Sequence, residues 1–187
     1  MNGSNVRRQA IANAFERIVA SEGGLSMDPQ DRGNWTSGVV GQGELKGTKY
    51  GVSAMAYPFL NIATLTKDAA QYYFEKDYWD KVQADHFHPA IAFQLVDASY
   101  NHGRGNAIRM LQRAVDVADD GIIGPLTLDS VNGEDTDDVL HLFNAERLVF
   151  YTKISTFNRY GKGWVRRVAE NMKWAADDND APWGGYE

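Results

Sequence analysis

The feature that most constrains the fold of this chain is Glu22-Gly23-Gly24, because two adjacent glycines break a helical pattern that precedes them. Upstream, apolar side chains recur every three or four residues, as on one face of a helix. They are Ile11, Ala14, Phe15, Ile18 and Val19. We therefore expect an amphipathic helix from near Val6 to about Ser21, with Glu22 at its C-terminal end.

This position favours a protonated Glu22. The last carbonyl groups of a helix carry partial negative charge, and apolar neighbours desolvate a carboxylate, so both disfavour ionisation. Cleavage of a glycosidic bond requires a protonated carboxyl as general acid and a second carboxylate that stays ionised. Asp31 lies nine positions further on in a polar stretch and fits the second role. Taken singly, each residue also fits a simpler interpretation, as a solvated helix end or an ordinary turn.

The order Glu22, Asp31, Thr36 resembles the Glu-Asp-Thr arrangement of phage-type lysozymes, in which the acid ends the first helix and the other two residues lie on a small β-hairpin. Four motifs are more specifically similar to glycoside hydrolase family 108, whose members are N-acetylmuramidases, many of them phage endolysins. The motifs are Glu22-Gly23-Gly24, Asp31-Arg32-Gly33-Asn34-Trp35-Thr36, Gly47-Thr48-Lys49-Tyr50-Gly51-Val52-Ser53 and Ala56-Tyr57-Pro58. The resemblance implies that Glu22 is the acid and that Asp31 occupies the family's Asp-x-Gly motif.

The resemblance leaves some positions open. Many members have an aromatic residue directly after Glu-Gly-Gly, whereas this chain has Leu25, so a candidate sugar-stacking contact is absent there. The family's threonine signature aligns with Thr36 or, past an insertion, with Thr48. Spacing favours Thr36 as the catalytic threonine, which leaves Thr48 and Tyr50 as candidate substrate contacts. Packing of the hairpin onto the helices is an equally good interpretation of Tyr50.

The second half resembles the peptidoglycan-binding segment that accompanies this family, through Leu111-Gln112-Arg113 and the stretch from Asp120 to Leu128. We expect a lysozyme-like muramidase domain over residues 8–100, a helical peptidoglycan-binding segment over 101–177 packed on it, and an acidic tail over 178–187. The chain has no Ser- or Thr-rich linker and no long repeat, which argues against two freely moving domains.

The predicted fold class is mostly α, of the α+β lysozyme-like kind: a helical bundle with a small β-hairpin region lining the cleft. The hairpin region is the glycine-rich stretch 25–53. The predicted helices after it run from a cap at Thr66 or Thr64 through Trp79, from Pro89, over 105–115, from Pro125, from Thr136, and over about 162–176.

Asp97 and Asn101 lie one helical turn apart near the end of the buried helix that begins at Pro89. A polar pair in this position either forms internal hydrogen bonds or lines a cleft, and the sequence leaves both open. The resembled family has a similar Asp and Asn before a Gly. We therefore count both residues as candidate substrate contacts.

Other chemistries lack support. The chain has no cysteine, which excludes disulfides and metal thiolate sites. His86 and His88 are the only closely spaced histidines, and only His102 and His141 remain elsewhere, so a zinc cluster is not expected. Gly41-Gln42-Gly43 lacks the third glycine and the helix of a dinucleotide fingerprint. We expect no metal and no cofactor.

The net charge of −6 argues against a nucleic-acid partner. Residues 158–176 nevertheless carry five basic side chains against one acid, a local charge of +4. The basic residues are Arg159, Lys162, Arg166, Arg167 and Lys173. We expect a monomer whose final helix contacts an anionic outer envelope or membrane, although helices with one apolar face more often close a globular core.

The N-terminal stretch from Met1 to Gln9 has no apolar run of signal-peptide length. We therefore expect the chain to stay in the host bacterial cytoplasm until it is released to the periplasm, and the resemblance implies release by a phage holin.

The primary hypothesis is a muramidase that hydrolyses the β-1,4 bond between N-acetylmuramic acid and N-acetylglucosamine. Glu22 protonates the leaving oxygen, Asp31 positions water or stabilises the transition state, and Thr36 helps to hold the water. The alternatives are a lytic transglycosylase, a non-catalytic peptidoglycan-binding protein and a membrane-perturbing protein.

Overall fold

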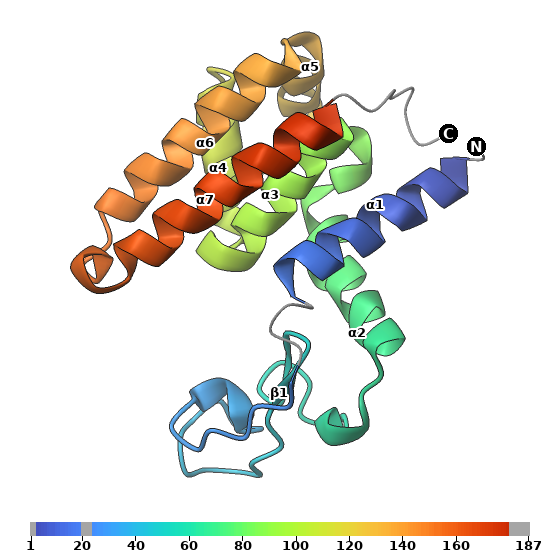
Figure 1. The fold of residues 1–187 in the computed structure, drawn as a ribbon, viewed down its shortest axis with the longest axis vertical. Helices are drawn as coiled ribbons and strands as arrows, with labels where there is room; N and C mark the ends of the chain where they lie inside the picture. Colours follow the sequence, from blue (N-terminus) through green and yellow to red (C-terminus); the bar gives the residue numbers. More distant parts are fainter. Residues whose placement is uncertain (1–2, 20–23, 180–187) are drawn as a thin grey trace. The chain divides into compact units, whose positions relative to one another are not determined.

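A computed structural model describes residues 3–19 and 24–179 of the chain. Over these residues the chain is mostly helical, with one small antiparallel sheet (Figure 1). The predicted mostly-α class is therefore confirmed. The chain forms two compact units, one of residues 11–77 and the other of residues 1–10 and 78–187. We call them the loop unit and the bundle unit.

The loop unit has its core between two helices, α1 (Gly3–Ile18) and α2 (Lys67–Phe74). The Phe15 and Phe74 rings meet edge to face, with centroids 5.5 Å apart. Helix α1 begins three residues before the predicted Val6, because the polar residues there give no hydrophobic signal. Its predicted end at Ser21 lies outside the described residues.

The predicted hairpin region contains strands β1 (Thr48–Lys49) and β2 (Val52–Ser53), which pair antiparallel with Thr48 opposite Ser53. Two isolated bridges extend the pairing, Ser26 with Thr48 and Trp35 with Leu45. Short 3-10 turns lie on either side of the sheet in sequence, η2 (Arg32–Asn34) and η3 (Ile62–Thr64). The strands are short because most of this region forms turns.

Thr66, rather than Thr64, caps α2, since its side chain accepts a hydrogen bond from the backbone nitrogen of Ala69 at 3.2 Å. The predicted helix through Trp79 is only partly α-helical. After Phe74 the chain widens into a π-helical segment, η4 (Glu75–Trp79), and then forms two 3-10 turns, η5 (Asp80–Val82) and η6 (Ala84–His86). Hydrophobic periodicity does not distinguish these helix types over so few residues.

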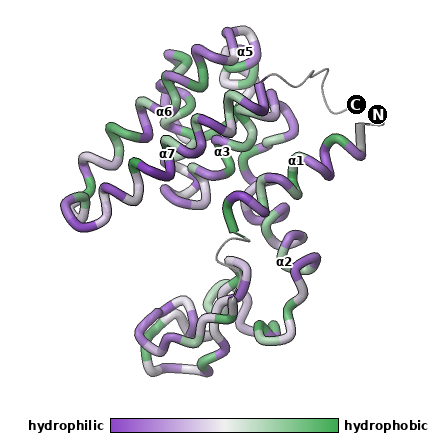
Figure 2. Tube along the Cα trace, viewed as in Figure 1, coloured by the Kyte–Doolittle hydropathy of each residue, from purple (hydrophilic) through white to green (hydrophobic). Residues whose placement is uncertain are grey.

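The bundle unit consists mainly of five helices, and the first of them, α3, packs against three others, α4, α6 and α7 (Figure 1). The five are α3 (Pro89–His102), α4 (Arg104–Ala114), α5 (Pro125–Gly133), α6 (Thr136–Thr152) and α7 (Phe157–Asn179). Nearly every side chain of α3 is buried, as its unbroken apolar run predicted. Along α6 and α7, hydrophobic and hydrophilic residues alternate, as on helices with one buried face (Figure 2).

Two helix starts in the bundle unit test the predicted boundaries. Helix α6 begins at Thr136, as predicted, and its cap is Asp135, whose carboxylate accepts bonds from the nitrogens of Asp137 and Asp138 at 2.9 and 3.3 Å. Helix α7 begins at Phe157, five residues before Lys162, although two glycines in its first turns lower its propensity.

Candidate functional site

Glu22, the predicted acid, lies in the segment 20–23, outside the described residues. The other predicted site residues are all described. Asp31, Thr36, Thr48 and Tyr50 belong to the loop unit, and Asp97 and Asn101 belong to the bundle unit.

Asp31 is an exposed carboxylate fixed by its own backbone turn. It caps η2, and its Oδ1 accepts a hydrogen bond from the Gly33 nitrogen at 2.8 Å. Asp28 forms the same kind of turn three residues earlier, with Oδ1 accepting from the Gln30 nitrogen at 2.9 Å. A turn of this type restricts the side chain while the second carboxylate oxygen faces solvent. Asp31 is therefore an ordered, solvent-exposed carboxylate.

Buried Asn34 connects the Asp31 turn to the sheet. Its side-chain nitrogen donates to the Asp28 backbone carbonyl at 2.9 Å. Its backbone carbonyl accepts from the backbone nitrogens of Lys46 and Gly47, both at 3.0 Å. Gly47 has φ +85°, and a Cβ there would lie 2.5 Å from the Ser26 carbonyl oxygen, so the close approach requires glycine. The sequence interpretation missed Asn34, since an Asn in a polar loop gives no signal of burial.

Thr36 forms a reciprocal pair with Glu44. The Thr36 nitrogen donates to the Glu44 carbonyl at 3.0 Å, and the Glu44 nitrogen donates to Thr36 Oγ1 at 2.9 Å. A hydroxyl that accepts a bond still has its own hydrogen to donate. The Thr36 hydroxyl is thus held in place and is able to orient a water molecule.

Thr48 and Tyr50 lie on the hairpin. Thr48 exchanges backbone bonds with Ser26 at 2.9 and 3.0 Å, so it is the central pairing position of this region. Tyr50 and Gly51 form the two-residue turn between the strands, with φ angles of +49° and +75°. Positive φ at both positions suits a type I′ hairpin turn, where Asn-Gly is preferred. A tyrosine in this conformation is strained, and strained residues concentrate at functional sites.

Asp97 lies in a buried ionic network of the bundle unit. It is 1% exposed and pairs with Arg147, with Arg167 at 2.8 Å, and with the side-chain amide of Asn171. Asn101 also donates to it, at 3.2 Å to the carboxylate and 2.7 Å to the carbonyl. Of the two interpretations that the sequence left open, internal hydrogen bonding accounts for these contacts of Asp97. A direct substrate contact by Asn101 stays a prediction.

Two positive charges maintain the ionised form of Asp97. Burial would raise the pKa of the carboxyl, but Arg147 and Arg167 outweigh this effect and lower it overall. Arg147 is itself fully buried and also donates to Gln94 at 2.9 Å. An arginine among the apolar positions of a helix is a sequence signal for such a network, because a buried charge requires partners.

His102, at the end of α3, is buried beside this network. Its ring stacks on Phe150, with centroids 5.2 Å apart, and lies 4.5 Å from the ring of Tyr151. Neither ring nitrogen has a hydrogen-bond partner among the described residues. Burial and the nearby Arg147 lower the pKa of His102 to about 3. The ring is therefore neutral at ordinary pH.

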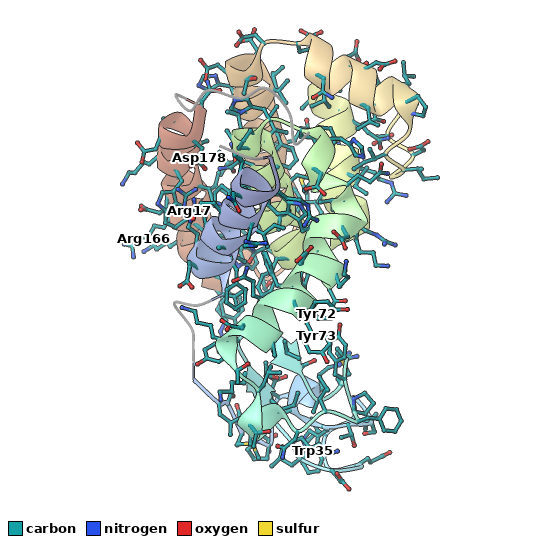
Figure 3. The ribbon with its side chains drawn as sticks, turned by 90° about the vertical axis from the view of Figure 1, so that its right-hand side faces the viewer. Arg17, Trp35, Tyr72, Tyr73, Arg166 and Asp178 are labelled. Carbon is teal, nitrogen blue, oxygen red and sulfur yellow. The ribbon has the colours of Figure 1, made fainter. Side chains whose placement is uncertain are left out.

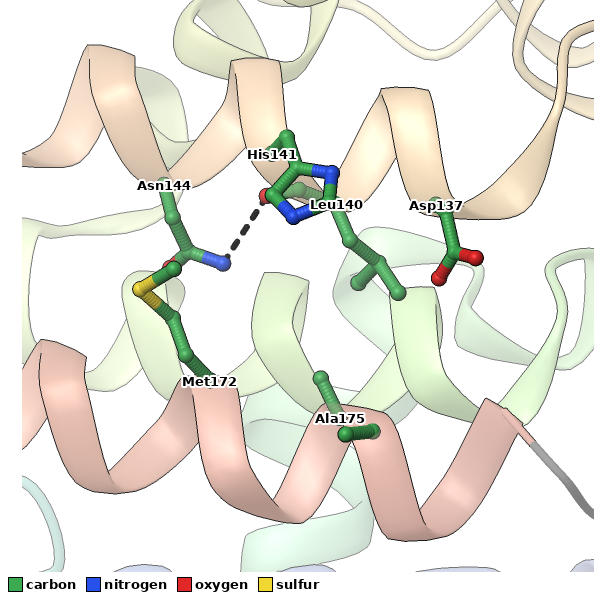
Figure 4. Close-up of a pocket in the computed structure, with 7 residues that line it drawn as sticks. Asp137, Leu140, His141, Asn144, Met172 and Ala175 are labelled. Carbon is green, nitrogen blue, oxygen red and sulfur yellow. Dashed lines mark hydrogen bonds between the residues drawn. The ribbon is translucent and has the colours of Figure 1, made fainter.

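A small pocket lies between α6 and α7 (Figure 4). Its volume is about 70 Å³, and its lining comes from α6 and α7 rather than from any predicted site residue. The Asn144 amide at its edge is already bonded to the Leu140 carbonyl at 2.9 Å. We therefore do not assign this pocket to the substrate.

Comparison with known proteins identifies both halves of the chain. Residues 15–103 match the family model described as Glycosyl hydrolase 108. This part of the chain is therefore similar to the glycosyl hydrolase 108 family. Residues 106–169 match the model described as Predicted Peptidoglycan domain. The predicted family is thereby confirmed, and together the two matches support a glycoside hydrolase that acts on peptidoglycan.

Among solved structures, the chain is similar to SagA from Brucella abortus. The two share 26% sequence identity with a TM-score of 0.76, over 93% of this chain and 98% of that one. A comparison with curated protein sequences finds no match.

The family boundaries and the compact units divide the chain differently. The glycosyl hydrolase 108 match includes α3, yet α3 packs within the bundle unit against α4, α6 and α7, most of whose residues match the peptidoglycan domain. The hydrolase segment therefore contributes a central helix to the bundle that the second segment builds.

Proposed function

We propose that this glycosyl hydrolase 108 protein is a muramidase that hydrolyses the β-1,4 bond between N-acetylmuramic acid and N-acetylglucosamine. The observation that carries the proposal is the exposed Asp31 carboxylate, held by its own turn within the segment that matches a glycoside hydrolase family. The peptidoglycan domain match supports the choice of polymer.

Each candidate residue has a distinct role in this proposal. Glu22 protonates the leaving oxygen as general acid. Asp31 stays ionised and either positions water or stabilises the positive charge that develops on the sugar. Thr36 orients the water through its hydroxyl hydrogen, because its oxygen already accepts from Glu44. Thr48, Tyr50 and Asn101 are proposed substrate contacts.

The acid is tested by Glu22→Gln, which keeps the shape of the side chain and removes its transferable proton. General acid catalysis contributes about 10²–10⁴-fold, so turbidity clearing of purified sacculi should fall by at least about 100-fold. The control is Glu16→Gln on α1, whose exposed carboxylate pairs with Lys67. A Glu22→Gln rate above about a tenth of wild type would remove Glu22 from this role.

The second carboxylate offers a closely matched comparison. Asp31 and Asp28 form the same turn, and an asparagine oxygen accepts the same backbone bond in both. Asp31→Asn should lower the lytic rate strongly, whereas Asp28→Asn should not. An equal loss of lytic rate in both variants would show that the charge of Asp31 has no specific role in catalysis.

Analysis of the products by mass spectrometry distinguishes the alternatives. A reducing muramic acid end identifies a muramidase, an anhydro end identifies a lytic transglycosylase, and no product identifies a binding or membrane-perturbing protein. The presence of two ordered groups, Asp31 and Thr36, favours hydrolysis, since a transglycosylase needs no activated water.

We also propose that the protein acts as a monomer and contacts an anionic envelope through α7. A surface groove of about 460 Å³ follows one face of this helix. Its lining is Phe157, Asn158, Gly161, Lys162, Val165 and Arg166. Arg166 points away from the bundle (Figure 3). Cationic heads around an apolar floor suit lipid phosphates.

We further propose phage-type action from inside the host: storage in the cytoplasm as an endolysin and release to the periplasm by a holin. Among the described residues, no helix is long and apolar enough to span a bilayer. Fractionation of expressing cells with and without a co-expressed holin tests this proposal. The protein should be found in the periplasmic fraction only when the holin is present.

A further inference from the structure

Phe59 is the most exposed large apolar side chain among the described residues. Its side chain is 97% exposed. Burying a phenylalanine is worth about 1.5–3 kcal/mol, and this fold gains none of it. An aromatic side chain displayed in this way is a candidate for binding rather than for folding.

The backbone turn that carries Phe59 is rigid. The Leu60 nitrogen donates to the Tyr57 carbonyl at 3.1 Å, which places Pro58 and Phe59 at the two central positions of a β-turn. Tyr57 anchors the turn to α2, because its ring lies 4.4 Å from that of Tyr73 and its hydroxyl donates to Asp77. Tyr73 projects from α2 toward this part of the loop unit (Figure 3). These contacts hold the backbone that carries Phe59, while its ring faces solvent.

Lys46 connects this turn to the predicted site. Its ammonium donates to the Pro58 carbonyl at 2.7 Å and pairs with Glu44 at 3.1 Å. The Glu44 carbonyl in turn accepts from the Thr36 nitrogen, and the Glu44 nitrogen donates to the Thr36 hydroxyl. The path from Thr36 through Glu44 and Lys46 to Pro58 lies within the loop unit, so Phe59 belongs to the same hydrogen-bonded framework as the proposed water-orienting residue.

We propose that Phe59 is a binding platform for the glycan strand of peptidoglycan, stacking its ring on the apolar face of a sugar away from the cleaved bond. The inference rests on the proposed function and adds a subsite to it. Because the turn already fixes its backbone, Phe59 loses little backbone freedom on binding, and its ring offers a flat apolar surface to a sugar.

Charge disfavours a membrane as the alternative partner. The exposed Glu44 carboxylate and the Asp77 carboxylate both lie on the framework that holds the turn. The Lys46 ammonium is already shared between Glu44 and Pro58. Anionic lipid head groups would be repelled here, whereas an uncharged sugar face would not.

The test is sedimentation of the protein with purified sacculi on ice, with turbidity checked to be unchanged so that binding is measured without digestion. Phe59→Ala should weaken binding about tenfold, which corresponds to about 1.4 kcal/mol. Phe59→Trp should restore it. The matched control is Val40→Ala, which removes another exposed apolar side chain of the loop unit.

Three outcomes would overturn the proposal: unchanged binding in Phe59→Ala, equal loss in Val40→Ala, or a loss that appears only with vesicles of phosphatidylethanolamine and phosphatidylglycerol. Because this experiment measures binding and not hydrolysis, its result can be interpreted independently of the proposed muramidase activity. A wild-type protein that binds sacculi through Phe59 but releases no muramic acid ends would refute the muramidase and keep the platform.

Discussion

At the scale of single residues, buried His102 predicts how stability responds to acid. In the unfolded chain a histidine takes up a proton below about pH 6.5, whereas in the fold the pKa of His102 is lowered to about 3. Between these values protons bind the unfolded state preferentially. Stability from this residue is therefore complete above about pH 6.5 and is lost progressively as pH falls toward 3.

His102→Phe should remove this dependence, because a phenyl ring fits the stack with Phe150 and Tyr151 and takes up no proton. Urea unfolding at pH 7, 6, 5 and 4 measures the effect. Below pH 6.5, the wild-type free energy of unfolding should fall faster than that of the variant, by up to about 1.4 kcal/mol per pH unit. Parallel curves would contradict the assignment.

At the scale of elements, a tyrosine occupies a position of the hairpin turn that favours asparagine. Tyr50→Asn gives the turn the Asn-Gly sequence that positive φ angles prefer, so we expect stabilisation of about 0.5–1 kcal/mol. If Tyr50 contacts the substrate, KM on sacculi rises in the same variant. Thermal unfolding measures the stability, and initial rates on sacculi measure KM. A stabilised variant with an unchanged KM would show that Tyr50 does not contact the substrate.

Helix α7 carries two kinds of basic residue that its sequence does not distinguish. Arg167 pairs with buried Asp97, whereas Lys162 and Arg166 line the exposed groove. The double variant Lys162→Gln with Arg166→Gln should change stability by no more than about 0.5 kcal/mol per site and reduce binding to anionic vesicles.

Arg167→Gln is the matched comparison for α7. It should destabilise the fold by more than the double variant, because it removes a partner from a buried carboxylate. Urea unfolding and vesicle sedimentation give the two readouts. Equal stability of the two variants would refute the structural role of Arg167.

At the scale of the whole molecule, we expect the two family segments to depend on each other for folding. The hydrolase match ends at residue 103, just after α3, whose apolar side chains are buried against α4, α6 and α7. A chain truncated after residue 103 would expose this helix, and we expect it to be insoluble or to lack a cooperative unfolding transition. Circular dichroism of the truncated and full chains tests this, and a cooperatively folding fragment would contradict it.

The structural role of some residues can be predicted from the sequence, and that of others cannot. Periodicity located α3 through its unbroken apolar run, and the glycine-rich composition located the hairpin, because both signals are local. The sequence did not identify Asn34 as the buried connection between the Asp31 turn and the strands. That role depends on partners at Asp28, Lys46 and Gly47, which only folding brings together.

The sequence by itself determined the family and the candidate carboxylates, since motif spacing and helix-ending glycines are properties of neighbouring residues. Only the tertiary structure decided which polar residues are structural. Asp97 and Arg167 are 70 positions apart and meet through the packing of α3 against α7. Phe59, in contrast, is apolar by type and exposed by position, and no local pattern distinguishes it from a core residue. Burial is a collective property of the fold, and so are the functions that depend on it.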